Sequence, residues 1–349
     1  MFSKLRSLIF KIDPETAHTL AIKSLKLNLV SNIFDENKGD PMFESTLFGK
    51  KIDNPIGMAA GFDKNAEVYN SLFRLGFGFV EVGTITPLRQ YGNPKPRIFR
   101  LVEDEALINR LGFNNTGADD INSRIRSTIP QGLLGINIGP NKETEDQIKD
   151  YLICLRKFHD IADYITINIS SPNTENLRDF HKKTKFDRLI NSVEEEKNKL
   201  KSKTTIVVKI SPDISDEQAV ELSRILLRYE IKAIIVSNST EQNRDNLINI
   251  LKHQKGGLSG KPLELKSNLL INKFYKLLKG RTKIIGVGGV DSGKSAYAKF
   301  LAGASYVQLY TGMVFQGPNI VGKIKKELKE ILIKEGAKNY SDIVGRKKY

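Results

Sequence analysis

The sequence is almost free of cysteine and has no long apolar run. Its 349 residues include one cysteine, Cys154, which excludes an internal disulfide and fits a reducing compartment. No apolar run approaches the roughly 20 residues that a membrane-spanning helix needs. The N-terminal stretch MFSKLRSLIFKIDPE holds only the short apolar run LIF, followed at once by charge, which does not match a signal peptide. We expect a cytosolic chain that does not span a membrane.

Features that would point directly to one class of protein are missing as well. No set of His, Cys and Asp residues has the spacing of a metal site, so no metal is expected, and we find no internal repeat or low-complexity linker. The net charge of +15 suits nucleic acid, an anionic membrane surface or simply a lysine-rich proteome. Because α/β barrels commonly reach about 250 residues or more as one unit, the length predicts one large domain with an appendage.

Eight short, nearly continuous apolar segments rich in β-branched residues recur along the chain, mostly with helix-length amphipathic segments between them. Parallel strands that are buried on both faces have this pattern. It therefore predicts an α/β fold, the (β/α)₈ or TIM barrel. The segments are NPIGMAAG, FVEVGT, LLGINIG, YITINIS, TIVVKIS, AIIVSNS, KIIGVGGV and YVQLYT.

The C-terminal ends of these eight segments carry small or polar residues. In a (β/α)₈ barrel these ends meet at the face that holds the active site. Any one of these residues could be a turn or cap residue, but eight such ends together predict a functional rim. The ends are Ala60 to Lys64, Gly83-Thr84, Asn137, Asn168, Lys209, Ser237 to Ser239, Gly288-Gly289 and Tyr310-Thr311.

Two insertions interrupt the alternation of strands and helices. PRIFRLVEDEALINRLGFNN has the pattern of a hairpin with its turn at Val102 to Glu105, and KGGLSGKPL places glycines where a backbone approaches something closely. Long loops at a catalytic face are usually lids or ligand walls. After the seventh strand, GVGGVDSGKSA combines glycines with a helix start near Asp291, which predicts an anion site. The position after strand seven suits a phosphorylated cofactor such as FMN, with Lys209 as a cation available to a flavin ring or its side chain.

The N-terminal residues form two predicted amphipathic helices. Phe2, Leu5, Leu8, Ile9 and Ile12 make an apolar stripe flanked by basic residues. A second helix begins with a cap at residue 13 and proline at residue 14. The pair either packs on the barrel or anchors the protein to an anionic lipid surface.

Six motifs in this order resemble the quinone-dependent, class 2 dihydroorotate dehydrogenases: GMAAGFDKNA, VGTITPLRQYGNPKPRIFRL, NRLGFNN, INISSPNTENLR, GGLSGKPL and GVGGVDSG. The resemblance covers essentially the whole chain, including DPETAH near the N-terminus. It implies oxidation of dihydroorotate to orotate, with FMN and then a membrane quinone as acceptors, in pyrimidine synthesis. Residues 1–40 would form a helical extension at the quinone entrance, and residues 41–349 the catalytic barrel. The protein would be a monomer bound peripherally to the cytoplasmic side of the inner membrane, with no nucleic-acid partner.

The resemblance also assigns roles to single residues. Ser171 would be the base that removes a proton from the substrate carbon next to a carbonyl, while hydride leaves the neighbouring carbon. Neutral amides suit the imide edges of a pyrimidine ring. The substrate residues would be Lys64, Asn109, Arg110, Leu111, Gly112, Phe113, Asn168, Asn173, Asn238 and Ser239. The FMN residues would be Ala60, Gly61, Phe62, Asp63, Lys64, Thr84, Asn137, Asn168, Lys209, Ser237, Gly260, Gly289, Tyr310 and Thr311. The quinone tunnel would hold His18, Arg100 and Tyr310.

Other interpretations of the same residues stay open. Asn173 could simply cap a turn and His18 could be an ordinary packed histidine. An FMN-dependent RNA-modifying reductase of the dihydrouridine synthase type would explain the net charge through phosphate contacts. Such enzymes use a catalytic cysteine, however, and Cys154 lies on a helical pattern that suits a packed small hydrophobe. A non-enzymatic basic scaffold would leave the polar strand ends unexplained.

Overall fold

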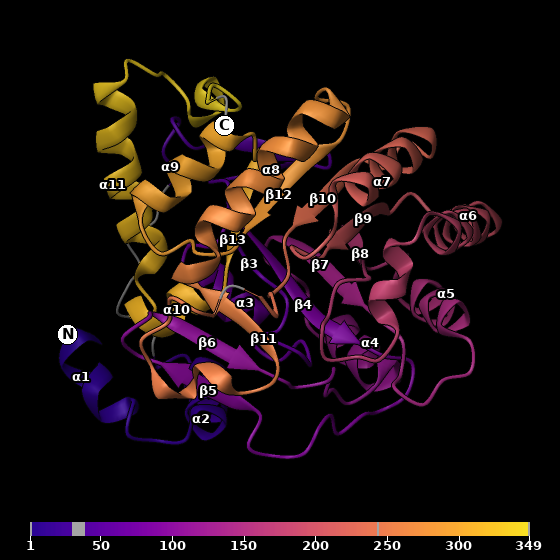
Figure 1. Cartoon of the computed structure of the whole chain (residues 1–349), viewed down its shortest axis with the longest axis horizontal. Coiled ribbons are helices and arrows are strands. Elements are labelled where there is room, and N and C mark those ends of the chain that lie inside the picture. Colours follow the sequence, from indigo (N-terminus) through magenta and orange to yellow (C-terminus); the bar gives the residue numbers. More distant parts are fainter. Residues whose placement is uncertain (1, 30–38, 243, 348–349) are drawn as a thin grey trace.

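The computed structural model describes residues 2–29, 39–242 and 244–347. Its centre is a closed barrel of parallel strands with helices around it (Figure 1). Around the barrel the strands follow the order β10-β12-β13-β3-β4-β7-β8-β9. They are β3 (Ile56–Met58), β4 (Phe79–Ile85), β7 (Leu133–Ile138), β8 (Tyr164–Asn168), β9 (Thr205–Ile210), β10 (Ala233–Val236), β12 (Lys283–Val287) and β13 (Tyr306–Leu309). Each coincides with a predicted segment, so the (β/α)₈ prediction is confirmed.

Burial on both faces explains why these strands read as continuous apolar runs. All seven residues of β4 are buried, because one face packs into the barrel and the other against helices. Local capping fixes where helices begin: Ser215 and Gln218 form a capping box at the start of α7. The helices are α3 (Tyr69–Arg74), α4 (Ala118–Ser127), α5 (Gln147–Phe158), α6 (Lys183–Lys199), α7 (Asp216–Arg228), α8 (Glu264–Leu278), α9 (Gly293–Ala302), α10 (Thr311–Gln316) and α11 (Ile320–Lys334). Single 3₁₀ turns are η2 (Leu177–His181), η3 (Ile250–His253), η4 (Lys261–Leu263) and η5 (Tyr340–Ile343).

A hairpin of β1 (Ser45–Leu47) and β2 (Lys50–Ile52) covers the N-terminal end of the barrel. Leu47 and Ile52 are buried in one cluster with Phe79 and Tyr164, which point into the barrel. The ring of Phe48 lies 5.2 Å from that of Tyr164. Because apolar side chains fill this end, a ligand must enter the barrel at the opposite, C-terminal end.

The first insertion forms the predicted hairpin, β5 (Ile98–Leu101) and β6 (Ala106–Asn109). The second insertion, for which no strand was predicted, adds β11 (Gly257–Gly260) antiparallel to β6, giving the sheet order β11-β6-β5. Glycine permits this close pairing: a Cβ on Gly260 would lie 2.4 Å from the carbonyl oxygen of Glu105. The two insertions therefore build one wall beside the rim.

Two helices at the N-terminus lie beside this sheet, α1 (Phe2–Ile9) and α2 (Pro14–Lys26) (Figure 1). As predicted, Asp13 caps α2 by accepting a hydrogen bond from the N–H of Thr16 at 2.9 Å. Helix α2 packs on β5 and α3, and α1 packs on α10. The predicted domain boundary at residue 40 follows residues 30–38, which lie outside the described part of the chain. None of the helices in the described residues has the length and hydropathy to cross a bilayer.

Candidate active site

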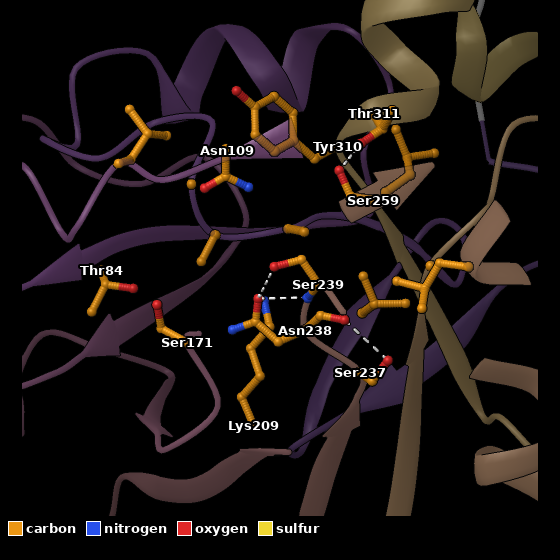
Figure 2. A pocket seen from close by; sticks show the side chains of 18 of the residues that line it. Thr84, Asn109, Ser171, Lys209, Ser237, Asn238, Ser239, Ser259, Tyr310 and Thr311 are labelled. Carbon is orange, nitrogen blue, oxygen red and sulfur yellow. Dashed lines mark hydrogen bonds between the residues drawn. The ribbon is translucent and has the colours of Figure 1, made fainter. Parts of the chain in front are cut away.

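A polar cavity of about 150 Å³ opens at the C-terminal ends of the barrel strands (Figure 2). Every barrel strand except β7, or the loop after it, contributes residues to its wall, and most of the others come from β6, β11 and the segments that follow them. The structure thus brings together most residues that the sequence proposed. Those that line the cavity are Ala60, Gly61, Lys64, Thr84, Asn109, Leu111, Gly112, Phe113, Asn168, Ser171, Asn173, Lys209, Ser237, Asn238, Ser239, Gly260, Gly289, Tyr310 and Thr311.

A buried network of amides and a hydroxyl lies along one side of the cavity. The Thr84 hydroxyl donates to Oδ1 of Asn137 at 2.6 Å. Nδ2 of Asn168 donates to both of them, at 3.0 Å to Thr84 Oγ1 and 3.1 Å to Asn137 Oδ1. Three strand ends, β4, β7 and β8, are tied together in this way, so the polar atoms are held in place before any ligand binds.

Ser171 follows directly on this network in the loop after β8. It is buried, and its Oγ accepts a hydrogen bond from the N–H of Asn173 at 3.2 Å. Nδ2 of Asn173 in turn donates to Oδ1 of Asn109 at 3.3 Å, joining the loop to β6. Figure 2 shows Ser171, Lys209, Asn238 and Asn109 around one cavity. A backbone donor on Ser171 Oγ stabilises negative charge that develops there.

Arg178 holds this loop against its neighbours. Its Nε donates to the carbonyl of Ser170 at 3.3 Å, and its Nη2 donates to the carbonyl of Ser239 at 3.1 Å. Its Nη1 pairs with Asp213 at 3.1 Å and with Glu241 at 3.0 Å. One guanidinium therefore connects the loops after β8, β9 and β10.

Two lysines bring positive charge to the cavity from opposite strands, β3 and β9. Burial lowers the pKa of Lys64 to about 8. Burial also lowers the pKa of Lys209, and the nearby Glu81 carboxylate offsets part of this effect. Among the described residues neither ammonium has a hydrogen-bond partner, so both are available to a ligand.

Glycines form a cradle at the end of the cavity next to β12 and β13. Gly289 has a φ of +76°, and a Cβ there would lie 2.5 Å from Cβ of Glu264. A Cβ on Gly312 would lie 2.2 Å from the carbonyl oxygen of Val290. No acceptor in the described residues takes the N–H of Gly289 or Gly312, which leaves two donors for an anion. The cradle fits the phosphate of a flavin cofactor, and the hydroxyls of Ser259 and Thr311, 2.9 Å apart, lie beside it.

Four predicted site residues do not line this cavity. The Asp63 carboxylate accepts hydrogen bonds from the N–H groups of Glu67 and Val68, each at 2.8 Å, and burial raises its pKa to about 6. Phe62 faces a second cavity. The remaining two are Arg110, which lies 4.5 Å over the Phe99 ring, and Asn137, which sits behind Thr84 and Asn168.

Sequence reasoning also missed residues that the structure places here. Ser259, Leu263, Val287, Val290 and Leu309 line the cavity. Ser259 belongs to GGLSGKPL, so its motif was recognised but its hydroxyl was not. The apolar residues read as ordinary strand and helix positions, and nothing in their pattern distinguishes a cavity wall from the core.

A second, larger cavity of about 490 Å³ lies between the N-terminal helices and the barrel. The predicted tunnel residues His18, Arg100 and Tyr310 all line it, and Tyr310 lines the polar cavity as well. The rings of His18 and Phe62 lie 5.1 Å apart, and those of Phe62 and Tyr310 lie 5.8 Å apart. Burial lowers the pKa of His18 to about 3, so its imidazole is neutral near pH 7.

The residue that follows α1, Phe10, holds the side chain of Arg100 in place. Its Nη1 donates to the carbonyl of Phe10 at 3.1 Å, and its guanidinium lies 4.3 Å from the centre of the Phe10 ring. Its buried Nε has no hydrogen-bond partner in the described residues. Apart from this group and His18, the cavity is lined mostly by apolar side chains such as Leu5, Ile9 and Met313.

The cysteine and a buried histidine lie outside both cavities. Cys154 is fully buried in α5, and burial raises the pKa of its thiol, which disfavours the thiolate. His181 accepts from the N–H of Ser211 at 3.2 Å, and burial lowers its pKa to about 4. Both residues are therefore structural, as predicted for Cys154. Within residues 2–29, 39–242 and 244–347, no group of three or more His, Cys, Asp or Glu is arranged to hold a metal ion.

A parallel barrel with a polar rim cavity, a buried lysine and a glycine cradle is the arrangement of a flavin-dependent barrel oxidoreductase. The family model described as dihydroorotate dehydrogenase matches residues 42–332, and the chain belongs to this family. "Dihydroorotate dehydrogenase (quinone)" of Bartonella tribocorum is 43% identical over 343 residues, which cover 97% of this chain and 94% of the relative.

A mouse protein and a solved structure from Eimeria tenella are similar to this chain as well. "Dihydroorotate dehydrogenase (quinone), mitochondrial" of Mus musculus is 42% identical over 344 residues, covering 96% of this chain and 87% of the mouse protein. The crystal structure of DHODH in complex with ferulenol from Eimeria tenella superposes with a TM-score of 0.92 at 37% identity, covering 96% of this chain and 95% of that chain. The names of the Bartonella tribocorum and mouse proteins both specify quinone.

Proposed function

We propose that this protein oxidises dihydroorotate to orotate in pyrimidine synthesis, with FMN as the first electron acceptor and a membrane quinone as the second. The observation that carries this proposal is the pair of cavities that meet at Tyr310. One is polar and enclosed by the rim, as a small polar substrate requires, and the other is apolar, as a quinone requires.

The substrate would lie against the amides from β6 and the loops after β8 and β10. A pyrimidine ring presents neutral donors and acceptors along its edges, and amide side chains match both. Asn109 and Asn173 are already aligned with each other by their 3.3 Å hydrogen bond. Lys64 supplies a cation for the substrate carboxylate, and Asn238 and Ser239 line the same cavity (Figure 2).

Ser171 would accept the proton that leaves the substrate carbon next to the carbonyl. A serine hydroxyl is a weak base, so its surroundings must stabilise the developing charge. The N–H of Asn173 donates to Ser171 Oγ, and Lys64 lines the same cavity. FMN, when bound, supplies the acceptor for the hydride from the neighbouring carbon. Lys209 would contact its ring system, and the cradle of Gly289 and Gly312, together with Gly260 and Thr311, would hold its phosphate.

The larger cavity would admit the quinone from the membrane. Exposed leucines on the N-terminal helices, Leu5, Leu8 and Leu20, have 47%, 59% and 47% of their surface accessible, and lysines and arginines flank them. Such helices suit peripheral attachment to the cytoplasmic side of an anionic inner membrane. Because each cavity is completed within one chain, a monomer suffices for the activity, and we propose that the protein acts as one.

An anaerobic flavin experiment tests this proposal. The purified protein should show a flavin spectrum, and the flavin released on denaturation should be FMN by chromatography. Dihydroorotate should bleach the spectrum, and reoxidation by a panel of quinones, fumarate and NAD should be fast only with quinones. A protein whose flavin is not bleached by dihydroorotate would contradict the proposed substrate, and preferred reoxidation by NAD or fumarate would contradict the proposed acceptor.

A further inference from the structure

Glu81 is a fully buried acid inside the barrel, on β4 below the rim cavity. Its Oε1 accepts a hydrogen bond from Nδ2 of Asn137 at 2.8 Å. Its Oε2 accepts from Tyr164 Oη at 3.0 Å, Thr166 Oγ1 at 3.2 Å and Gln308 Nε2 at 3.2 Å. A buried carboxylate is costly unless it is fully hydrogen-bonded, and all of these partners donate to it. Glu81 is therefore used purely as an acceptor.

The hydrogen bonds continue from Glu81 toward the cavity in one direction. Because the amide nitrogen of Asn137 donates to Glu81, its Oδ1 faces Thr84 and Asn168. There it accepts from Thr84 Oγ1 at 2.6 Å and Asn168 Nδ2 at 3.1 Å. Oδ1 of Asn168 then accepts from the hydroxyl of Ser170 at 2.9 Å. Each amide thus points its oxygen away from Glu81.

The same direction holds beyond Ser170. Oγ of Ser170 accepts from Nδ2 of Asn238 at 2.9 Å. Oδ1 of Asn238 accepts from Ser239, from its N–H at 2.7 Å and its hydroxyl at 3.3 Å. Donors and acceptors therefore alternate without reversal from Ser239 to the carboxylate of Glu81. The residues of this hydrogen-bond series that line the cavity are Thr84, Asn168, Asn238 and Ser239.

We propose that Glu81 is a positioning residue that holds Asn137 with its Oδ1 toward Thr84 and Asn168. An amide can exchange the places of its oxygen and nitrogen by rotation about one bond. The backbone N–H groups of Ser170 and Ser239 prevent this at Asn168 and Asn238, to whose Oδ1 atoms they donate at 3.2 and 2.7 Å. Asn137 is held by side chains alone within the described residues. A carboxylate can only accept, and it removes the reversed arrangement. This inference rests on the proposed function, in which these side chains present a fixed donor and acceptor pattern to the substrate and the cofactor.

Glu81→Gln tests the direction of the chain with little change in volume. The glutamine nitrogen would face either Nδ2 of Asn137 or the side chains of Tyr164, Thr166 and Gln308. Where it faces Asn137, that amide must rotate and turns its Nδ2 toward Thr84 and Asn168. We expect the dissociation constant of orotate, measured by titration of the flavin absorbance, to rise by about tenfold or more, as for a misaligned buried polar group. Flavin retained through gel filtration should also fall.

A double variant that moves the carboxylate from residue 81 to residue 137 distinguishes an effect of hydrogen-bond direction from an effect of packing. In Glu81→Gln/Asn137→Asp, the new carboxylate at residue 137 accepts from the glutamine and again accepts from Thr84 and Asn168. The original direction returns, so orotate affinity should recover to within about threefold of the parent protein. Asn137→Asp alone places two carboxylates side by side and should lose flavin. Thr166→Val is the matched control, because it removes one donor to Glu81 without reversing any bond, and it should stay within about threefold.

The outcomes are distinct. Parent-like orotate binding by Glu81→Gln would overturn the inference, and so would weaker binding that the double variant does not restore. If Glu81→Gln does not fold, the double variant decides: the inference requires that Glu81→Gln/Asn137→Asp folds, retains flavin and binds orotate within about threefold of the parent protein. Failure of this double variant to fold or to bind orotate would then overturn it. Bleaching of the parent flavin by dihydroorotate tests the proposed function separately. If that bleaching fails, the amount of flavin that each Glu81 and Asn137 variant retains still tests the role of Glu81.

Discussion

The two cavities of this chain differ in size, polarity and in how their walls are held. The rim cavity measures about 150 Å³, and its amides and hydroxyls bond to one another before a ligand arrives. The cavity under the N-terminal helices measures about 490 Å³ and offers few polar groups, chiefly His18 and Arg100. Its outer wall consists of α1 and α2, which carry partly exposed leucines.

The difference follows from the physics of each kind of contact. Buried polar groups must be paired with good geometry, so a polar site needs the rigid ends of barrel strands to hold it. Apolar burial has no direction, and two helices resting on a sheet suffice to provide it. The rim is thus built to discriminate between small polar ligands, whereas the outer cavity suits an apolar ligand.

Removing the base should break the rim chemistry most severely. In Ser171→Ala the flavin and orotate affinity should remain, while the rate of flavin reduction by dihydroorotate falls by about 10² to 10⁴-fold, the usual contribution of a general base. Stopped-flow absorbance under anaerobic conditions measures this rate. Ser171→Cys should lose less, and more of its rate should return at higher pH as the thiolate forms. A rate near that of the parent for Ser171→Ala would refute the assignment.

Filling the outer cavity should impair only the second half-reaction. Ala17→Trp places an indole among the lining residues. Loss of apolar contacts worth about 3 kcal/mol would slow reoxidation by a long-chain quinone roughly 10²-fold at limiting quinone. Flavin reduction and reoxidation by a small soluble acceptor should be unchanged. Thr19→Trp, on the exposed side of the same helix, is the control, and equal quinone rates in both variants would show that the cavity does not serve the quinone.

Truncating the paired amides should weaken substrate binding without touching the cofactor. Asn109→Ala or Asn173→Ala leaves an edge of the buried ring unpaired, at a cost of about 1 to 3 kcal/mol. Orotate affinity, from flavin absorbance titrations, should fall by the corresponding factor while flavin content stays constant. The double variant should lose less than the sum, because the two side chains are hydrogen-bonded. Loss of flavin with normal orotate affinity would place these residues on the wrong side of the cofactor.

The smallest effect is expected from pH. Since burial lowers the pKa of Lys64 to about 8, its ammonium is present below that pH and is lost as the pH rises through it. Orotate is anionic, so its affinity should be constant below pH 8 and fall above it by up to about tenfold per pH unit. Lys64→Gln should bind more weakly throughout and lose this step. A step of the same size in Lys64→Gln would mean that another group titrates.

Much of this architecture is readable from the amino-acid pattern, because it depends on local physics. Strands buried on both faces must be apolar, so the eight barrel strands were recognisable, and the polar residues at their ends marked the rim. Asp13 with Pro14 marked the start of α2 for a similarly local reason, the unpaired N–H groups of a first turn.

What depends on side-chain direction was decided by packing between distant segments. Asp63 and Phe62 belong to the same strand-end motif as Lys64, yet one caps a backbone turn and the other faces the outer cavity. The position of Glu81 within FVEVGT did not indicate a functional role. Its hydrogen-bond partners lie on β7, β8 and β13 and come together only when the barrel closes. A sequence states which groups a strand carries, but which of them share a cavity follows from how the strands twist and pack around one axis.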